Sequence, residues 1–285
     1  MKVFLTGSSG ILGTDIQSEL EKENHEVLGF NSQNIRLGNR TEVEKKVCDF
    51  KPDVLIHSAA MTNVDLCEDD KDAAVEINIT GSNNMAIAAA KNNIPIVYIS
   101  SCGVYGNKKK SAYTELDEPE PITYHHYTKF EGEKKVREIS NFHLIIRPGW
   151  LFGGTQNHQK NFVEARRKEA LLNPVMKSAA DKFGSPTYTL DLAKQIIKLL
   201  DINALGTYNL VNTEPASRFE YIAQILLELG YTNTLLPVDS KAFPRRANMP
   251  DNEVLENYNL SLLKGQKMRT WKEALKDYIS NTYQK

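Results

Sequence analysis

The sequence has few cysteines and no long apolar run, and both absences narrow the class of protein. Its three cysteines, Cys48, Cys67 and Cys102, are odd in number and lack the spacing of a metal site. This pattern predicts a reduced cytoplasmic protein that holds no metal. No apolar run approaches the roughly 20 residues that cross a bilayer, and the residues before the first glycine are too few for a signal peptide. We therefore expect no membrane partner.

An excess of charge of one sign is also missing. The 35 lysine and arginine residues are balanced by 36 aspartate and glutamate residues, which gives a net charge of -1. A chain with so little net charge has no general attraction to nucleic acid, and we expect no nucleic-acid partner. Apolar residues are plentiful, at 41% of 285, which is enough to bury the core of one large domain or two modest ones.

Strand and helix patterns alternate through the first half of the chain. The strand patterns fall on residues 2–6, 25–30, 53–57, 94–100 and 142–147, and the helical patterns on residues 14–23, 41–50, 72–92 and 124–138. Thr41 is placed to cap the second helix. Such alternation predicts an α/β protein with a Rossmann-type, doubly wound parallel sheet that helices cover on both faces.

The second half is less regular, and loops with proline and glycine interrupt it. Helices are predicted at residues 162–170, 190–200, 219–230 and 271–281, with a short strand at 207–211. We expect a dinucleotide-binding domain at residues 1–150. A smaller, mainly substrate-binding lobe is expected at residues 151–285, with the chain crossing back to the first domain.

A glycine motif follows the first strand and opens the first helix. Gly7 permits a tight turn, Gly10 lets the backbone approach a pyrophosphate, and Gly13 allows the helix to pack closely on the strand. Backbone N–H groups at the helix start would then meet the phosphate charge. The alternative is a glycine-rich turn without a ligand. The predicted cofactor contacts in this segment are Gly7, Ser9, Gly10, Ile11, Leu12 and Gly13.

Other segments are expected to line the same cofactor site. The second strand ends at Asn31 without the acidic residue that often binds the ribose of NAD, and Arg36 lies just downstream. Arg36 favours NADP over NAD if it meets a 2′-phosphate; otherwise it is a solvated loop residue. The small residues Ser58, Ala59 and Ala60 end the third strand and would let the cofactor lie against backbone.

Taken together, these segments resemble the dTDP-4-dehydrorhamnose reductase family of the extended short-chain dehydrogenase superfamily. The resemblance covers nearly all of the chain and is carried by residues 7–13, 57–65, 98–101, 129–133, 147–153, 184–193 and 246–248. It implies NAD(P)H-dependent reduction of the 4-keto group of a nucleotide-linked 4-keto-6-deoxy sugar, for cell-surface polysaccharide synthesis. The segment 104–106 is more similar to nucleotide-sugar epimerases, so an epimerase is an alternative.

The resemblance also implies roles for single residues. Ser101, which is 28 positions before Lys129, takes the hydroxyl role, and Lys129 takes the lysine role beside the nicotinamide ribose. The proton-donating tyrosine of the Tyr-x-x-x-Lys motif falls on His125. Three interpretations remain open: His125 is the acid, a local shift brings Tyr124 into the cleft, or the protein binds cofactor or nucleotide sugar without catalysis.

Five residues are predicted on the substrate side. Trp150 could pack on a sugar or base, although a core tryptophan is the alternative. Arg246 could clamp a diphosphate, although surface charge is the alternative. The full set is Thr62, Val64, Cys102, Trp150 and Arg246. Nothing in the sequence separates a monomer from a homodimer.

Overall fold

A six-stranded parallel sheet forms the centre of the molecule. The computed structural model describes residues 1–283; residues 284 and 285, at the end of the predicted C-terminal lobe, lie outside the described residues. The strand order is β10-β5-β4-β3-β1-β2. The strands are β1 (Lys2–Thr6), β2 (Glu26–Phe30), β3 (Val54–His57), β4 (Ile96–Ile99), β5 (His143–Pro148) and β10 (Gly206–Leu210).

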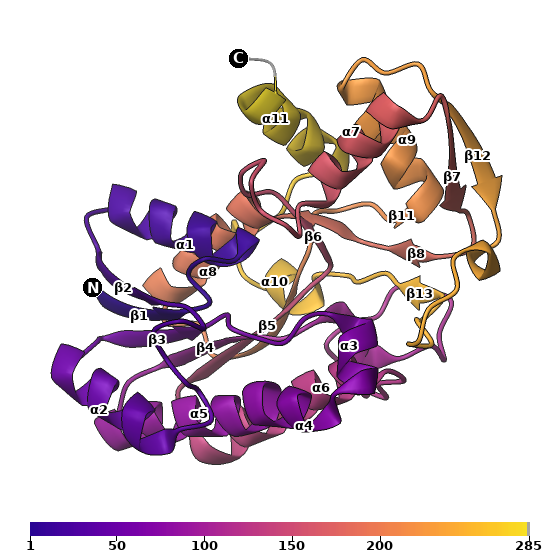
Figure 1. Cartoon of the computed structure of the whole chain (residues 1–285). Helices are drawn as coiled ribbons and strands as arrows, with labels where there is room; N and C mark the ends of the chain where they lie inside the picture. Colours follow the sequence, from indigo (N-terminus) through magenta and orange to yellow (C-terminus); the bar gives the residue numbers. More distant parts are fainter. Residues whose placement is uncertain (284–285) are drawn as a thin grey trace.

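Helices cover both faces of this sheet, as Figure 1 shows. On one face, α1 (Ile11–Lys22) and α8 (Thr189–Asp201) share an apolar core with the strands. On the other face, α2 (Arg40–Phe50), α5 (Gly81–Asn92) and α6 (Tyr124–Ile139) do the same. The two central strands β3 and β4 are buried throughout, as expected for a sheet with two covered faces. The predicted α/β fold with a parallel sheet is confirmed.

Two elements of this core come from the second half of the chain. β10 pairs in parallel with β5, with Thr207 opposite Ile145. α8 buries Leu192, Ile196 and Leu199 on one face, at the spacing of successive helical turns. The first 150 residues therefore do not complete the sheet and its helices by themselves. The boundary at residue 150 remains a prediction.

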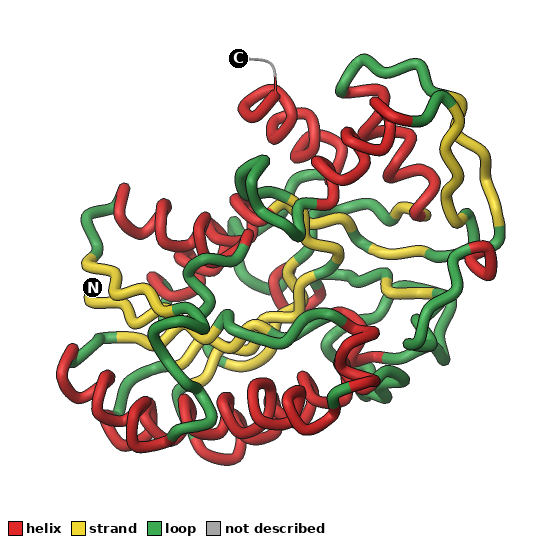
Figure 2. Tube along the Cα trace, viewed as in Figure 1, coloured by secondary structure: helices red, strands yellow, loops and turns green. Residues whose placement is uncertain are grey.

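The smaller lobe combines helices with short strands, as Figure 2 shows, and its core is rich in aromatic side chains. Its helices are α7 (Phe162–Leu172), α9 (Arg218–Glu228) and α11 (Trp271–Tyr283). Its short strands are β6 (Trp150–Phe152), β7 (Val175–Ala179), β8 (Phe183–Gly184), β9 (Pro186–Tyr188), β11 (Ala216–Ser217), β12 (Thr234–Val238) and β13 (Asn252–Glu253). Phe152, Tyr188, Tyr221, Trp271 and Tyr278 lie together in its core, because large rings bury the most apolar area per residue.

The structure corrects several predicted boundaries. The single helix predicted at 72–92 is three pieces: α4 (Lys71–Ala74), a π-helical segment (Val75–Thr80) and α5. Thr41 does not cap α2; the side chain of Asn39 does, by accepting a hydrogen bond from the backbone N–H of Glu42 at 3.1 Å. α1 begins at Ile11, before the predicted residue 14, because Gly10 is its N-cap.

Some elements carried too weak a pattern to be predicted. The helices α3 (Val64–Asp69) and α10 (Tyr258–Ser261) are each shorter than two turns, so they contain too few residues for a helical period to show. Within residues 1–283, none of the helices has both the length and the apolar composition that a membrane crossing requires.

Removing the side chain of Leu192 tests whether the second half of the chain completes the core. Leu192 is fully buried in the cluster between α8 and the sheet, so Leu192→Ala should lower the free energy of unfolding by about 2–5 kcal/mol. Urea unfolding followed by circular dichroism measures this change. The matched control is Leu227→Ala on α9, where the side chain is 68% exposed and we expect a change within about 0.5 kcal/mol. Equal effects of the two variants would contradict the assigned core.

Candidate functional site

The predicted site residues gather where three parallel strands end. Gly7 follows β1, residues 58–60 follow β3, and Ser100 and Ser101 follow β4. β1 pairs with β3, and β3 pairs with β4, all in parallel, so these segments lie at one edge of the sheet. Ligands of open α/β sheets bind at this carboxyl edge.

The backbone packs so closely at Gly7 and Gly13 that a side chain would clash at either position. Gly7 has a φ of +72°, and a Cβ atom there would lie 2.7 Å from the Ala59 nitrogen. A Cβ atom at Gly13 would lie 2.1 Å from the Gly7 carbonyl oxygen. Among the described residues, no side chain caps the start of α1 at Gly10. The first turn of α1 therefore offers backbone N–H groups and a positive dipole end to an anion, as a pyrophosphate requires.

The residues predicted near the cofactor ribose already make contacts within the protein, which leaves only some of their polar groups free to bind a ligand. Asn31 accepts a hydrogen bond from the backbone N–H of Gln33 at 2.9 Å, so its side chain holds the turn after β2. Arg36 is exposed and its Nε donates to Glu42 at 3.1 Å. An exposed ion pair of this kind contributes little stability and exchanges readily. Glu42 uses only the Nε of Arg36, so the terminal N–H groups can still meet a phosphate.

Hydrogen bonds to β1 fix the loop after β3. The backbone N–H of Ser58 donates to the Thr6 carbonyl at 3.2 Å, and that of Ala59 donates to the Thr6 hydroxyl oxygen at 3.3 Å. Behind this loop, His57 is fully buried, and burial lowers its pKa to about 3. A neutral imidazole can serve both Thr6 and Ser82, which lie 2.7 and 3.2 Å from its two nitrogens.

His125 is buried, and its ring is held in one tautomer. Its Nδ1 lies 2.9 Å from the carbonyl oxygen of Met61, and a carbonyl can only accept, so Nδ1 carries the proton. Burial lowers the pKa of His125 to about 3, and the neighbouring His126 and Lys129 add to this shift. At neutral pH the ring is therefore uncharged, and its Nε2 is an acceptor. This geometry does not favour His125 as the proton donor.

Asn78 explains why the Met61 carbonyl is placed so firmly. Asn78 is fully buried in the π-helical segment. Its Oδ1 accepts from the Met61 N–H at 2.8 Å, while its Nδ2 donates to the Met61 carbonyl at 3.1 Å and to the Thr128 hydroxyl at 3.0 Å. The side chain thus ties the loop after β3 to helix α6, which carries His125.

Tyr124 faces a different set of neighbours. Its ring lies 5.6 Å from the ring of Tyr127, and the Lys71 Nζ lies 5.0 Å from its centroid. Partial burial and the neighbouring Tyr127 raise the pKa of Tyr124, which makes it a weaker acid. Use of Tyr124 as the donor would require a rearrangement of the start of α6.

Lys129 is an unpaired cation in a buried place. It is 2% exposed, and its Nζ lies 4.2 Å from the centre of the Tyr98 ring. The carboxylate of Glu133, one turn further along α6, forms ion pairs with the guanidinium groups of Arg147 at 2.7 Å and Arg137 at 2.8 Å. In the described part of the chain the Lys129 ammonium has no ion pair. Burial lowers the pKa of Lys129 to about 7, and the charge of Glu133 opposes the shift.

Ser101 holds the start of a short helix, next to the Cys102 thiol. It is the N-cap of a short 3-10 helix (Cys102–Tyr105), and its Oγ accepts from the Gly103 N–H at 3.4 Å. Since the hydroxyl oxygen is the acceptor in that bond, its hydrogen can rotate to another partner. Ser101 and Lys129 therefore bring a hydroxyl donor and an ammonium to the same edge of the sheet.

The predicted substrate residues fall into two groups. Thr62 accepts a hydrogen bond from Lys160, and Val64 begins α3. Arg246 pairs with Asp69 of α3 at 2.9 Å and is largely exposed. These contacts tie α3 to the loop before α7 and to the segment 245–247. They leave Arg246 with a carboxylate partner, so its charge is already balanced.

The second group consists of Trp150, which lines a pocket, and Cys102, which contacts the same pocket through Glu253. This pocket has a volume of about 650 Å³, and Trp150, Arg218, Arg246 and Glu253 are among the residues that line it. Glu253 accepts from the Trp150 Nε1 at 2.8 Å and from the Cys102 Sγ at 3.6 Å. Burial raises the pKa of Cys102 well above its usual range, so this thiol is not a nucleophile.

Sequence reasoning missed Arg218 and Glu253, which line this pocket, and His126, which lies next to Glu253. His126 fills the space beside Gly103, where a Cβ atom would lie 2.0 Å from the His126 ring. Its Nε2 lies 4.0 Å from Glu253. Only Arg218 left a signal in the sequence. It is the first residue of a helix that Ser217 and Glu220 cap, and a cation is unfavourable at a helix N-terminus.

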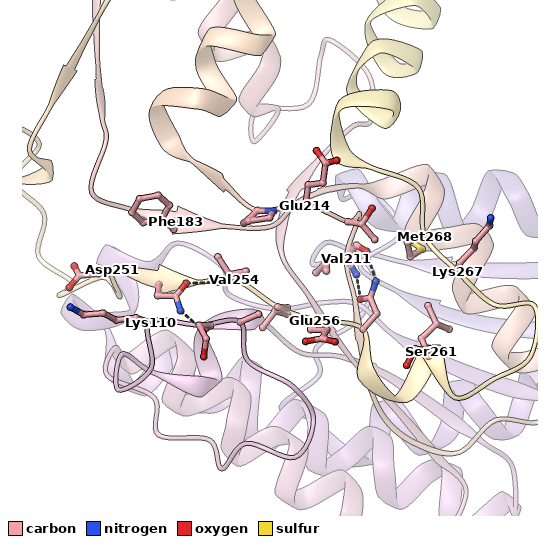
Figure 3. A pocket seen from close by; sticks show the side chains of 18 of the residues that line it. Lys110, Phe183, Val211, Glu214, Asp251, Val254, Glu256, Ser261, Lys267 and Met268 are labelled. Carbon is pink, nitrogen blue, oxygen red and sulfur yellow. Dashed lines mark hydrogen bonds between the residues drawn. The ribbon is translucent and has the colours of Figure 1, made fainter.

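Figure 3 shows a larger pocket, of about 920 Å³, elsewhere on the molecule. Its lining residues include Lys110, Phe183, Glu214, Glu256 and Met268. None of the predicted site residues is among the described residues that line it. Size alone therefore does not identify the site, whereas the strand ends do. Among residues 1–283, no group of three His, Cys, Asp or Glu side chains could hold a metal ion.

Comparisons with solved structures agree with this architecture. A dTDP-4-dehydrorhamnose reductase from Clostridium acetobutylicum is 35% identical, with a TM-score of 0.95 and 99% of each chain covered. A dTDP-4-dehydrorhamnose reductase from Bacillus anthracis, in complex with NADP, is 32% identical, with a TM-score of 0.94 and 99% of each chain covered. A UDP-glucose 4-epimerase from Thermus thermophilus, at 19% identity and a TM-score of 0.83 over 98% of each chain, shares the fold alone.

Sequence comparisons point the same way. The spore coat polysaccharide biosynthesis protein SpsK of Bacillus subtilis is 31% identical over 98% of this chain and 96% of its own length. A dTDP-4-dehydrorhamnose reductase from Aggregatibacter actinomycetemcomitans is 27% identical over 97% of both. The model of the RmlD substrate binding domain matches residues 1–284. The predicted resemblance is confirmed, and the chain belongs to the family of the RmlD substrate binding domain.

Proposed function

We propose that this protein reduces the 4-keto group of a nucleotide-linked 4-keto-6-deoxy sugar with NADPH or NADH, in cell-surface polysaccharide synthesis. The observation that carries the proposal is the glycine cradle at Gly7 and Gly13, at the same sheet edge as Ser101 and Lys129. Relatives named dTDP-4-dehydrorhamnose reductase support a substrate similar to dTDP-4-dehydrorhamnose. The epimerase alternative is less favoured, because the epimerases share the fold alone.

The chain's own residues fit a dinucleotide. The open start of α1 and the close contact of Gly7 with Ala59 suit a pyrophosphate, and the NADP complex of a relative supports NADP. The terminal N–H groups of Arg36 would then bind the 2′-phosphate. When bound, the reduced nicotinamide supplies the hydride.

Ser101 and Lys129 would act on the substrate oxygen. The Ser101 hydroxyl would donate a hydrogen bond to the carbonyl oxygen and so stabilise the charge that develops on it. The Lys129 ammonium, with its pKa lowered to about 7 by burial, is matched to proton donation near neutral pH. His125 Nε2, as an acceptor one helical turn from Lys129, would help to orient that ammonium.

The cellular setting follows from this function. We propose that the protein acts in the cytoplasm, where nucleotide sugars are made, and that its partner is the nucleotide-sugar substrate. The non-catalytic alternative, in which the fold binds cofactor or sugar only, is distinguished from the reductase by turnover. A monomer and a homodimer both remain compatible with the proposal.

The role of Lys129 predicts a pH dependence. With dTDP-4-dehydrorhamnose and NADPH, turnover should fall as the pH rises through about 7, because the ammonium form is lost there. Lys129→Met should lower kcat by about 10²–10⁴-fold, the usual contribution of a general acid. Lys135→Met, an exposed lysine on the same helix that pairs with Glu138, is the control. A flat pH profile together with an active Lys129→Met variant would rule out this role.

The tautomer of His125 predicts how its variants behave. His125→Asn keeps a donor near the Met61 carbonyl and removes the ring, so kcat should stay within about tenfold of wild type, less than the loss of a general acid costs. Tyr124→Phe should leave kcat unchanged. Steady-state kinetics with NADPH binding measured in parallel tests both. A loss of turnover in Tyr124→Phe with intact NADPH binding would show that α6 rearranges during the reaction.

A further inference from the structure

The cationic side chains that line the pocket beside Trp150 differ in their ion pairs and in their exposure to solvent. Four of them are ion-paired: Arg166 with Glu169, Lys182 with Asp251, Arg245 with Asp65, and Arg246 with Asp69. Lys177 and Lys241 are exposed to solvent. Arg218 differs from both groups, since it is half-buried and, in the described part of the chain, has neither an ion pair nor a side-chain hydrogen bond.

Aromatic rings hold the Arg218 guanidinium in place. Its Cζ lies 3.4 Å from the centre of the Trp150 ring and 5.5 Å from that of Phe162. Gly184 also packs against the indole, where a Cβ atom would come within 2.2 Å. Trp150 is 8% exposed, so it acts as a platform for Arg218. Stacking on rings leaves the N–H donors at the edge of a guanidinium available.

Glu253 holds the Trp150 indole in place. Its carboxylate accepts from the Trp150 Nε1 at 2.8 Å, which orients the indole. The charge of Glu253 acts on Arg218, but the two are not within ion-pair distance in the described chain. The N–H donors of this guanidinium, which lines the pocket, are therefore free to bind a ligand there. Planar N–H donors of this kind match phosphate and carboxylate oxygens.

We propose that Arg218 binds an anionic group of the substrate, a phosphate or a carboxylate, at the inner wall of this pocket. The inference rests on the proposed function, because it takes the pocket to hold the nucleotide sugar. Glu253 is a positioning residue, since it acts through Trp150. Cys102 and His126 also contact Glu253, and this places Arg218 near the residues that follow β4. The bound anion is therefore on the sugar side of the ligand: the diphosphate or a carboxylate of the sugar.

Calorimetric titration of wild type, Arg218→Met and Arg218→Lys with dTDP, dTDP-glucose and dTDP-glucuronate tests the proposal. Arg218→Met should weaken dTDP binding by about tenfold to hundredfold, the effect of losing hydrogen bonds to a charged group. Arg218→Lys should recover part of this loss, because it keeps the charge. Arg167→Met is the matched control. Arg167 lies on α7 and is held by Glu164 at 2.8 Å, so dTDP affinity should not change.

The outcomes separate the two sources of the anion. Weaker dTDP binding by Arg218→Met assigns the diphosphate. Unchanged dTDP binding with loss of a wild-type preference for dTDP-glucuronate over dTDP-glucose assigns a sugar carboxylate. Equal binding of all three ligands by wild type and Arg218→Met overturns the proposal, as does a wild-type protein that binds none of them. A wild type that binds dTDP but neither binds nor oxidises NADPH refutes the proposed function and leaves the Arg218 result standing.

Discussion

Burial of both faces of the six-stranded parallel sheet is the constraint on which the other features of this protein depend. A parallel sheet needs helices on each side, and α8 and β10 return from the second half of the chain to complete it. Because all six strands run the same way, their carboxyl ends meet at one edge. The glycine cradle, Ser101 and Lys129 share that edge as a result, and the smaller lobe is held beside it.

The polar groups at this edge are controlled by burial more than by pairing. Burial holds His57 and His125 in their neutral forms and lowers the pKa of Lys129 to about 7. Glu133 does not restore the charge of Lys129, because two arginines already occupy its carboxylate. The site therefore contains acceptors and a titratable ammonium in place of the phenol that the family motif expects. In the pocket beside Trp150, Arg218 covers the indole, for which the sequence left open contact with a sugar or base or a place in the core.

Local patterns predicted most of the fold and part of the site. Short β-rich and buried-strand runs located the strands of the central sheet, and the glycine spacing located the cradle, because each depends on neighbours within a few residues. The interruption of the helix predicted at 72–92 could not be predicted from local sequence. Asn78, in its π-helical segment, is hydrogen-bonded to Met61, which belongs to a different segment. The short strands of the smaller lobe, such as β8 and β13, contain two residues each and carry no period.

The sequence by itself determined that a dinucleotide cradle opens the chain, that Ser101 and Lys129 accompany it, and that His125 occupies the motif's tyrosine position. Only the tertiary structure decided what His125 can do, because its tautomer depends on the Met61 carbonyl, 64 residues away. It also brought Glu253 to Trp150 across 103 residues. Hydrogen bonds between distant segments leave no local pattern, and burial, which sets each group's charge, exists only after the chain has folded.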